Sequence, residues 1–199
     1  MIELKNVSFS RKGKSILSDF SLSVNDGECV CLFGPSGCGK TTALRLISGL
    51  EAPDSGEITA PDRLSYVFQE DRLVPTLTAL RNVTVCLRGN QKKRAASLLK
   101  ESGLESAADM KPSQLSGGMK RRLSIVRAVA FGGDALLLDE PFNGLDSETK
   151  AEMAKMIRRE FCDKGRTVIM VSHISEDAQI MNAETVIMDE QEKMLKENS

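Results

Sequence analysis

Hydrophobic residues recur along this chain with two distinct spacings. Apolar and polar residues alternate between Ile2 and Phe9 and again between Phe20 and Val24, which predicts strands of a half-exposed antiparallel sheet. Continuous apolar runs occupy Cys29–Phe33, Ala135–Leu138 and Thr167–Val171. Runs of this kind are typical of strands that are buried on both faces, as in a parallel sheet.

Apolar residues at helical spacing separate these runs. We expect helices at Thr42–Leu50, at Gln91–Leu104, from near Ser116 to Ala130, and around Met153–Phe161. Two short strands are expected at Ser65–Phe68 and, at the sheet edge, at Val186–Met188. Strands that alternate with helices predict an α/β fold with a parallel sheet. The polar residues from Glu190 onward are expected to fray.

Length and composition narrow the class of protein. The 199 residues suit one domain, or one domain with a small subdomain. With 41% hydrophobic and 28% charged residues the chain is not disordered. A net charge of -1 argues against a protein that works mainly by binding the nucleic-acid backbone. The apolar runs are too short to cross a bilayer, and the first residues lack a signal-peptide pattern.

The cysteines and the histidine limit the possible sites. Five cysteines in a chain without a secretion signal favour reduced thiols over a disulfide framework. A single histidine excludes a His-rich metal site.

One segment matches the phosphate-loop pattern G-x-x-x-x-G-K-[ST] at every position: Gly34, Pro35, Ser36, Gly37, Cys38, Gly39, Lys40 and Thr41. The segment lies between a buried strand and a helix, which is the context that the motif needs. Its backbone N–H groups are expected to point at phosphate oxygens, and the helix start adds its positive end. A Gly-rich turn that matches by chance is the alternative.

Each side chain at the end of this loop has an expected contact with a nucleotide. Lys40 would reach the β- and γ-phosphates, and the Thr41 hydroxyl would ligate Mg²⁺. Thr42 is positioned to bond the region of the α-phosphate. The motif predicts nucleotide binding and does not indicate what the energy is used for.

Two carboxylates follow the apolar run at Ala135–Leu138. Asp139, at the end of the expected strand, would hold Mg²⁺ through water, and Glu140 could act as the general base on an attacking water. Acidic residues also follow many strands as helix N-caps, so this pair alone is a weak signal.

The segment Leu115-Ser116-Gly117-Gly118-Met119 resembles the LSGGQ signature of the ABC ATPases. Together with the phosphate loop it makes the chain resemble the nucleotide-binding subunit of an ABC transporter, of importer type. Gln69 matches the Q-loop of that family, Asn143–Asp146 the D-loop, and His173 the switch histidine of the H-loop. The resemblance extends from about residue 4 to about residue 189.

The resemblance implies a mechanism and partners. Two copies would bind MgATP between them, head to tail, with Ser116, Gly117 and Gly118 of one copy facing the γ-phosphate held by the other. Gln69 would belong to the catalytic site and contact Mg²⁺, and His173 would contact the γ-phosphate. The expected partners are a second copy, transmembrane permease subunits and a substrate-binding protein, but no nucleic acid. The expected location is cytoplasmic, on the inner face of the membrane through the permease.

The resemblance also implies three regions within one ABC ATPase domain. Residues 1–70 and 133–199 would form the nucleotide-binding core, which includes an N-terminal antiparallel β-subdomain. Residues 71–132 would form a helical subdomain that carries the signature.

One departure from the family concerns the base of the nucleotide. Family members usually place an aromatic residue at the position of Arg11 to stack on adenine. Here Arg11 itself or Phe9, two residues away, could serve, because a guanidinium also stacks on a base. An exposed arginine at a strand end is equally compatible with the sequence.

Other functions are compatible with parts of this pattern. A soluble ABC-type ATPase that is not coupled to transport should show a basic face, a long insertion or a tandem second unit. A P-loop kinase would leave Ser116–Gly118 unexplained, and an ATP sensor without turnover would not need Glu140.

Two further predictions concern Cys38 and the basic runs of the chain. Near Lys40 and a helix start, Cys38 would be a reactive thiolate, whereas a Cys38 that points into the core beneath the loop would be inert. The basic runs 92–94 and 120–122 are expected to be solvated helix faces.

Overall fold

The computed structural model of this chain describes residues 1–87, 89 and 91–188. Its centre is a parallel sheet with the strand order β5-β6-β7-β3-β8. The strands of this sheet are β3 (Cys29–Phe33), β5 (Leu64–Val67), β6 (Ala135–Asp139), β7 (Thr167–Ser172) and β8 (Glu184–Ile187). Because the strands are parallel, the loops that follow β3, β6 and β7 meet at one edge of the sheet.

An antiparallel sheet with the order β2-β1-β4 forms a second layer. It contains β1 (Ile2–Arg11), β2 (Lys14–Val24) and β4 (Ser55–Thr59). The helices are α1 (Lys40–Ile47), α2 (Ala79–Thr84), α3 (Lys92–Glu101), α4 (Gly117–Phe131), α5 (Ser147–Glu160) and α6 (Ser175–Met181). Short 3-10 turns occupy Glu105–Ala107, Pro112–Gln114 and Cys162–Lys164.

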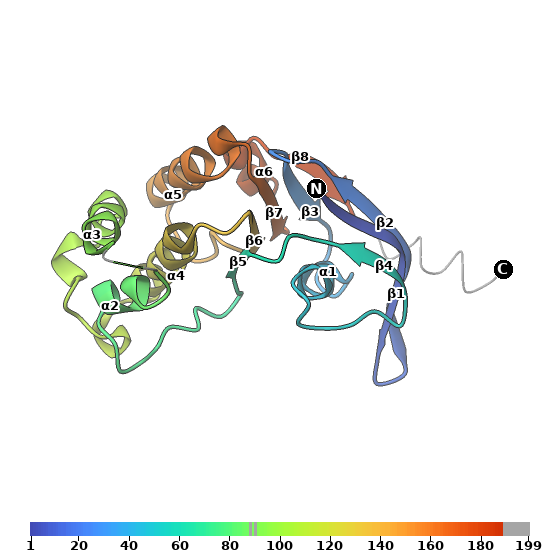
Figure 1. Cartoon of the computed structure of the whole chain (residues 1–199), viewed down its shortest axis with the longest axis horizontal. Coiled ribbons are helices and arrows are strands. Elements are labelled where there is room, and N and C mark those ends of the chain that lie inside the picture. Colours follow the sequence, from blue (N-terminus) through green and yellow to red (C-terminus); the bar gives the residue numbers. More distant parts are fainter. Residues whose placement is uncertain (88, 90, 189–199) are drawn as a thin grey trace.

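The two ends of the molecule differ in structure. In Figure 1 the antiparallel sheet lies at one end, α2 and α3 lie at the other, and the parallel sheet runs between them. Helix α4 connects the helical end to the parallel sheet, since it contacts α2, α3, α5 and β5.

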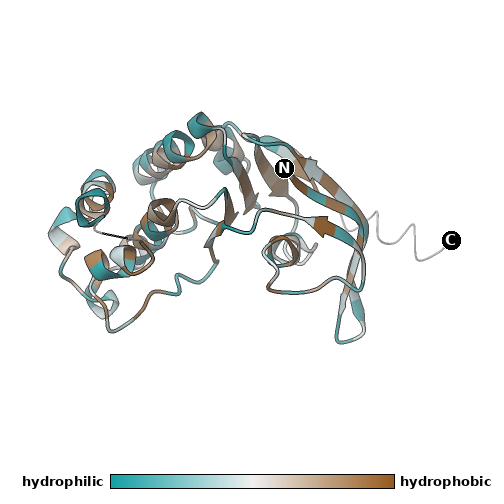
Figure 2. Cartoon of the chain, in the orientation of Figure 1, coloured by the Kyte–Doolittle hydropathy of each residue, from teal (hydrophilic) through white to brown (hydrophobic). Residues whose placement is uncertain are grey.

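The parallel sheet is buried on both faces, as its continuous apolar runs predict. Leu136 and Leu138 of β6 face a core that includes α4, α5 and α6, whereas Leu137 faces a second core with α1 and the antiparallel sheet. Figure 2 shows the resulting pattern, with hydrophobic strands inside and hydrophilic residues on the outer faces of the helices. Each fully buried leucine contributes roughly 1.5–3 kcal/mol.

The expected α/β fold is confirmed, and the predicted strands and helices are present, although β2 and α5 each begin six residues before the expected start. Three elements were not predicted because they are too short to show a period. Strand β4 has one apolar residue, Ile58, and α2 and α6 contain six and seven residues. The expectation for residues from Glu190 onward concerns positions outside the described ones.

Helix α4 begins where the sequence provides a cap. The Ser116 hydroxyl accepts a hydrogen bond from the Met119 N–H at 3.3 Å, and Gly132 ends the helix with φ +62°. Among the residues that the structure describes, no helix has both the length and the apolar character needed to cross a bilayer.

Candidate active site

The phosphate loop connects β3 to α1, and its glycines are required by their surroundings. A Cβ on Gly34 would lie 2.2 Å from the backbone oxygen of Met188, so a larger residue would displace the backbone there. Gly39 has φ +109°, and a Cβ at this position would lie 2.8 Å from a Leu17 methyl group. At Gly34 and Gly39 the backbone therefore lies too close to neighbouring atoms for any residue with a side chain.

The Lys40 side chain lies along this loop. Its ammonium donates hydrogen bonds to the backbone oxygens of Gly34 at 2.7 Å and Pro35 at 2.6 Å, and the residue is only 6% exposed. The positive charge is thus held at the loop by the carbonyl dipoles of Gly34 and Pro35.

The Cys38 thiol lies on the inner side of the loop. The residue is 1% exposed and belongs to the core shared with α1 and the antiparallel sheet. Its Sγ is 3.7 Å from the Lys40 ammonium. The expectation of an accessible thiolate in the phosphate space is therefore wrong, because the chain turns the side chain at position 38 under the loop. The competing expectation of a buried residue is confirmed.

Asp139 and Thr41 meet although they lie far apart in the sequence. The Thr41 hydroxyl donates to Asp139 Oδ1 at 3.0 Å. Asp139 is 2% exposed, and this burial raises the pKa of its carboxyl; the Thr41 hydrogen bond opposes that shift and the neighbouring Glu140 charge adds to it. Within the described parts of the chain, no cluster of three His, Cys, Asp or Glu side chains could hold a metal. A cation at this position would therefore need further oxygen donors, such as those of a nucleotide.

Glu140 adopts a backbone conformation that is rare for a side-chain-bearing residue, with φ +48°. Its N–H donates to the backbone oxygen of Val171 at 3.0 Å, which fixes the turn after β6 to the end of β7. Its Oε1 lies 3.2 Å from His173 Nδ1. The Glu140 side chain is half-buried, at 17% exposure, whereas that of His173 is exposed, at 48%.

A hollow of about 340 Å³ collects several of the predicted residues. Its lining consists of Ile16, Ser36, Gly37, Gly39, Lys40, Thr41, Thr42, Gln69 and Glu140. Ile16 was not predicted, because a single apolar residue in an alternating strand gives no signal of contact with a ligand. The lining thus combines polar groups with the apolar side chain of Ile16.

The signature segment is outside that hollow. None of Ser116, Gly117 and Gly118 is part of its described lining. Gly117 is exposed and a Cβ on it would meet nothing within 4 Å, while a Cβ on Gly118 would lie 3.7 Å from a Leu145 methyl group. The start of α4 thus lies beside the predicted D-loop and presents an open surface.

Arg11 and Phe9 lie together on β1. The Arg11 guanidinium is 5.8 Å from the centre of the Phe9 ring and forms an ion pair with Glu51. Arg45 also pairs with Glu51, at 2.5 Å. The two candidates for contact with adenine are therefore neighbours, and Arg11 has an acidic partner.

One of the basic residues of α4 contradicts the sequence expectation. Arg121 is 5% exposed, and its guanidinium binds backbone oxygens of the segments at residues 68–69 and 139–141. The expectation of a solvated face at 120–122 is wrong for this residue, because consecutive helical residues point about 100° apart and cannot share one face. The run 92–94 is exposed, as expected.

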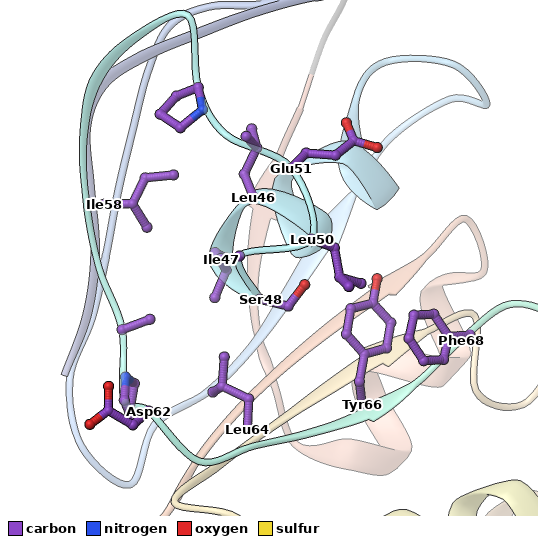
Figure 3. A pocket seen from close by; sticks show the side chains of 14 residues that line it. Leu46, Ile47, Ser48, Leu50, Glu51, Ile58, Asp62, Leu64, Tyr66 and Phe68 are labelled. Carbon is purple, nitrogen blue, oxygen red and sulfur yellow. The ribbon is translucent and has the colours of Figure 1, made fainter.

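A second hollow, of about 560 Å³, lies between the end of α1, β4 and β5 (Figure 3). The rings of Tyr66 and Phe68 stack in its wall, with their centres 4.1 Å apart. The Tyr66 hydroxyl and Glu51 Oε2 are buried and have no hydrogen-bond partner among the described residues. Leu50, at 49% exposure, lies at its rim.

A phosphate loop between β3 and α1 on a parallel sheet, with an aspartate at the end of β6, two strands away from β3, defines a P-loop nucleoside triphosphatase. Residues 17–143 match the family described as ABC transporter, and the chain belongs to this family. It is an ABC transporter ATP-binding subunit, an ATPase, and the resemblance seen in its motifs is confirmed.

The similar curated proteins are named as import ATP-binding proteins. The aliphatic sulfonates import ATP-binding protein SsuB 1 of Nocardia farcinica is 41% identical over 178 residues, which cover 88% of this chain and 73% of that protein. The taurine import ATP-binding protein TauB of Pseudomonas aeruginosa is 36% identical, with 94% of this chain and 77% of that protein covered.

A solved structure of an ATP-binding cassette has the same fold. The dimeric post-hydrolysis state of MJ0796, bound to ADP and Pi, has a TM-score of 0.85 and 32% sequence identity. The match covers 95% of this chain and 94% of that chain.

Proposed function

We propose that two copies of this chain bind MgATP between them, head to tail, and that hydrolysis to ADP and phosphate drives import through a membrane permease. The observation that carries this proposal is the hollow that brings the phosphate loop, Gln69 and Glu140 together, with His173 beside Glu140. Relatives named as import proteins and a dimeric cassette with ADP and Pi support it.

The phosphate loop would bind the triphosphate mainly through its backbone. The backbone N–H groups of the loop would face phosphate oxygens; Ser36, Gly37 and Cys38 would contribute main-chain donors, and Pro35, which has no N–H, would contribute loop geometry. Lys40 exchanges its loop carbonyls for the β- and γ-phosphates, and Thr42 contacts the α-phosphate region. Ile16 provides an apolar wall, with Arg11 or Phe9 beside the adenine.

Three oxygen donors fit Mg²⁺ at the same edge of the sheet. Thr41 and Asp139 are already within hydrogen-bond distance, and Gln69 lines the same hollow. Hydroxyl, carboxylate and amide oxygens are the ligands that this ion prefers. When bound, the ion neutralises charge on the phosphates.

Glu140 would act as the general base. Its carboxylate accepts a proton from a water whose oxygen attacks the γ-phosphorus, and the bond from that phosphorus to the β–γ bridging oxygen breaks, with ADP as leaving group. His173 donates a hydrogen bond to the γ-phosphate, and its contact with Glu140 orients both side chains.

The partner copy would complete each site. Ser116, Gly117 and Gly118 lie at the start of α4, whose positive end and first N–H groups suit the γ-phosphate of the other copy. Loss of the γ-phosphate removes this bridge, so the dimer opens after hydrolysis. The helical subdomain at residues 71–132 moves against the core formed by residues 1–70 and 133–199.

The permease would contact the surface beside Gln69. The hollow in Figure 3 is lined by Phe68, next to Gln69 in the chain, and combines stacked rings, an exposed Leu50 and two buried polar atoms without a hydrogen-bond partner in the described part of the chain. Such a surface suits a helix with apolar residues and a hydrogen-bonding group. This contact would hold the subunit at the cytoplasmic face of the membrane, and a substrate-binding protein would deliver the cargo on the other side. Co-purification of a permease, identified by mass, would support this assignment; full activity with no membrane partner would favour an ATPase uncoupled from transport.

Replacement of the base tests the catalytic proposal. Glu140→Gln should lower turnover by about 10² to 10⁴, the usual contribution of a positioned base, while MgATP binding persists. A dimer that depends on ATP should then appear by size-exclusion chromatography. The matched control is Glu184→Gln, an exposed residue of β8, which should keep wild-type turnover. Turnover of Glu140→Gln within a few-fold of wild type would remove Glu140 from this role.

A further inference from the structure

The Arg121 guanidinium is buried and fully hydrogen-bonded. Its nitrogens donate to the backbone oxygens of Phe68 at 2.6 Å, Gln69 at 3.3 Å, Asp139 at 2.7 Å, Pro141 at 2.9 Å and also Glu140. A guanidinium carries five N–H groups, so each of them has an acceptor here. We call Arg121 and these backbone oxygens the Arg121 cluster.

Burial of the Arg121 charge costs free energy, which a residue without a structural or functional role would not need to overcome. Burial lowers the pKa of Arg121, and the Asp71 carboxylate at 3.5 Å opposes that effect. A buried charge is retained only where hydrogen bonds and an opposite charge compensate its lost hydration. Removing the guanidinium would leave several buried carbonyl groups without a donor.

The carbonyls of the cluster belong to two catalytic segments. One segment leads into Gln69, and the other is the turn that carries Asp139 and Glu140. Glu140 has the strained φ of +48°, a conformation that persists only where its surroundings fix it. Arg121 binds the carbonyl on one side of Glu140 while Val171 accepts from its N–H on the other.

A second arginine extends this connection along α4. Arg127 donates to the backbone oxygens of Arg72 at 2.9 Å and Asp71 at 3.2 Å. The segment from Gln69 to Arg72 is therefore attached to the same helix that begins at Ser116. A shift of α4 would move this segment and the Glu140 turn together.

We infer that Arg121 is a positioning residue, which holds the Glu140 carboxylate and Gln69 in a fixed arrangement with the helix that begins the signature. This inference rests on the proposed role of Glu140 as the base. Arg121 touches no reacting atom, and it acts through the backbone of the residues that do.

Two substitutions test this role. Arg121→Lys keeps the charge but supplies three donors in place of a planar fork, and Arg121→Gln removes the charge. We expect kcat for ATP hydrolysis to fall about 10- to 100-fold in both, the effect of a displaced catalytic group, while KM for MgATP changes little because the phosphate loop is intact. The matched control is Arg122→Gln, since Arg122 lies on the same turn but donates to the Ser102 backbone oxygen, at 2.8 Å, which is far from Glu140 in the chain. Its kcat should match wild type.

A double-mutant cycle separates this inference from the proposed function. If Arg121 acts through Glu140, Arg121→Lys should lower kcat far less in a Glu140→Gln background than in the wild-type background. Full additivity would overturn the inference even if Glu140 is the base. If Glu140→Gln keeps its activity, Glu140 is not the base and the proposed function fails. The effect of Arg121→Lys on kcat and KM in the wild-type background is a separate measurement, so the two failures can be told apart.

Folding is checked in the same samples by thermal unfolding and MgATP binding. Asp71→Asn is a milder variant that weakens the hold on the guanidinium without exposing a carbonyl, and it should lower kcat about 2- to 5-fold at unchanged KM. A wild-type kcat in every folded variant of Arg121 and Asp71 would overturn the inference.

Discussion

The phosphate loop and the Arg121 cluster both hold a buried cation on backbone carbonyls, but they draw on different parts of the chain. Lys40 binds carbonyls five and six residues before it. Arg121 binds carbonyls between 18 and 53 residues away. The first arrangement is local and has a sequence motif, whereas the second exists only after the sheet and α4 have packed together.

This difference separates two kinds of contribution to one reaction. The phosphate loop should determine whether nucleotide binds, because its contacts are with the phosphates themselves. The Arg121 cluster should determine how fast bound nucleotide reacts, because it orients Glu140 and Gln69. Substitutions in the two regions should therefore affect different kinetic constants.

The largest expected effect comes from mixing two inactive variants. Lys40→Ala should abolish MgATP binding at its own phosphate loop, and Ser116→Arg should block the signature that it offers to a partner. In a mixed dimer one composite site is intact and the other carries both changes, so ATPase activity should reappear on mixing. Activity is measured by phosphate release at several mixing ratios.

The control for this experiment is Lys40→Ala mixed with itself, which has no intact site in any dimer. Normal hydrolysis by Ser116→Arg alone, at every protein concentration, would contradict the composite site.

The sequence predicted those parts of the site that are close together in the chain. Gly34–Thr41 and Asp139–Glu140 each follow a buried strand, and parallel strands bring their ends to one edge. The pattern therefore places Thr41 and Asp139 at the same edge of the sheet, in agreement with the 3.0 Å hydrogen bond between their side chains. The same alternation of strands and helices predicted the α/β fold.

The sequence could not supply contacts that depend on tertiary packing. Arg121 was assigned to a solvated run because neighbouring basic residues usually face water. A finer signal was present: Arg121 shares its helix face with Ser124, Ile125 and Ala128, all buried, at the i+3, i+4 and i+7 spacings. The direction of the Cys38 side chain had no such signal, since it depends on the turn of the loop.

A smaller effect, on the unfolding temperature, is expected from Asp139, whose carboxylate lies beside the phosphate loop. Asp139→Asn removes a buried carboxylate whose pKa is raised mainly by burial, although the nearby charges of Arg121 and Lys40 oppose that shift. Because burial raises the pKa of Asp139, its ionised form destabilises the folded chain. We expect Asp139→Asn to unfold at a higher temperature than wild type at neutral pH, by about 2–4 °C for each kcal/mol, while losing ATPase activity.

The difference in unfolding temperature between Asp139→Asn and wild type should depend on pH. The folded carboxyl binds its proton more tightly than the unfolded one, so ionisation costs stability only once the pH exceeds the ordinary pKa of an aspartate. The advantage of Asp139→Asn should vanish below that pH and grow as the pH rises through the raised folded value. Unfolding temperatures over a pH series measure this. Asp134→Asn, an exposed position just before β6, is the control for the loss of one carboxylate charge at the surface. A lower unfolding temperature for Asp139→Asn at neutral pH would show that the carboxylate stabilises the fold.

The smallest expected effect concerns Cys38, where the phosphate loop uses the backbone and buries the side chain. Brief N-ethylmaleimide treatment should label the partly exposed Cys86 and Cys162 but not Cys38, with or without MgATP. Cys38→Ser should hydrolyse ATP within about twofold of wild type, because the backbone contacts persist, and should lose about 1 kcal/mol of stability from a buried hydroxyl. Peptide mapping with a denatured sample as the positive control measures the labelling. Rapid labelling of Cys38 that MgATP prevents would mean that the thiol faces the phosphates. The phosphate loop would then use a side chain at position 38 as well as its backbone.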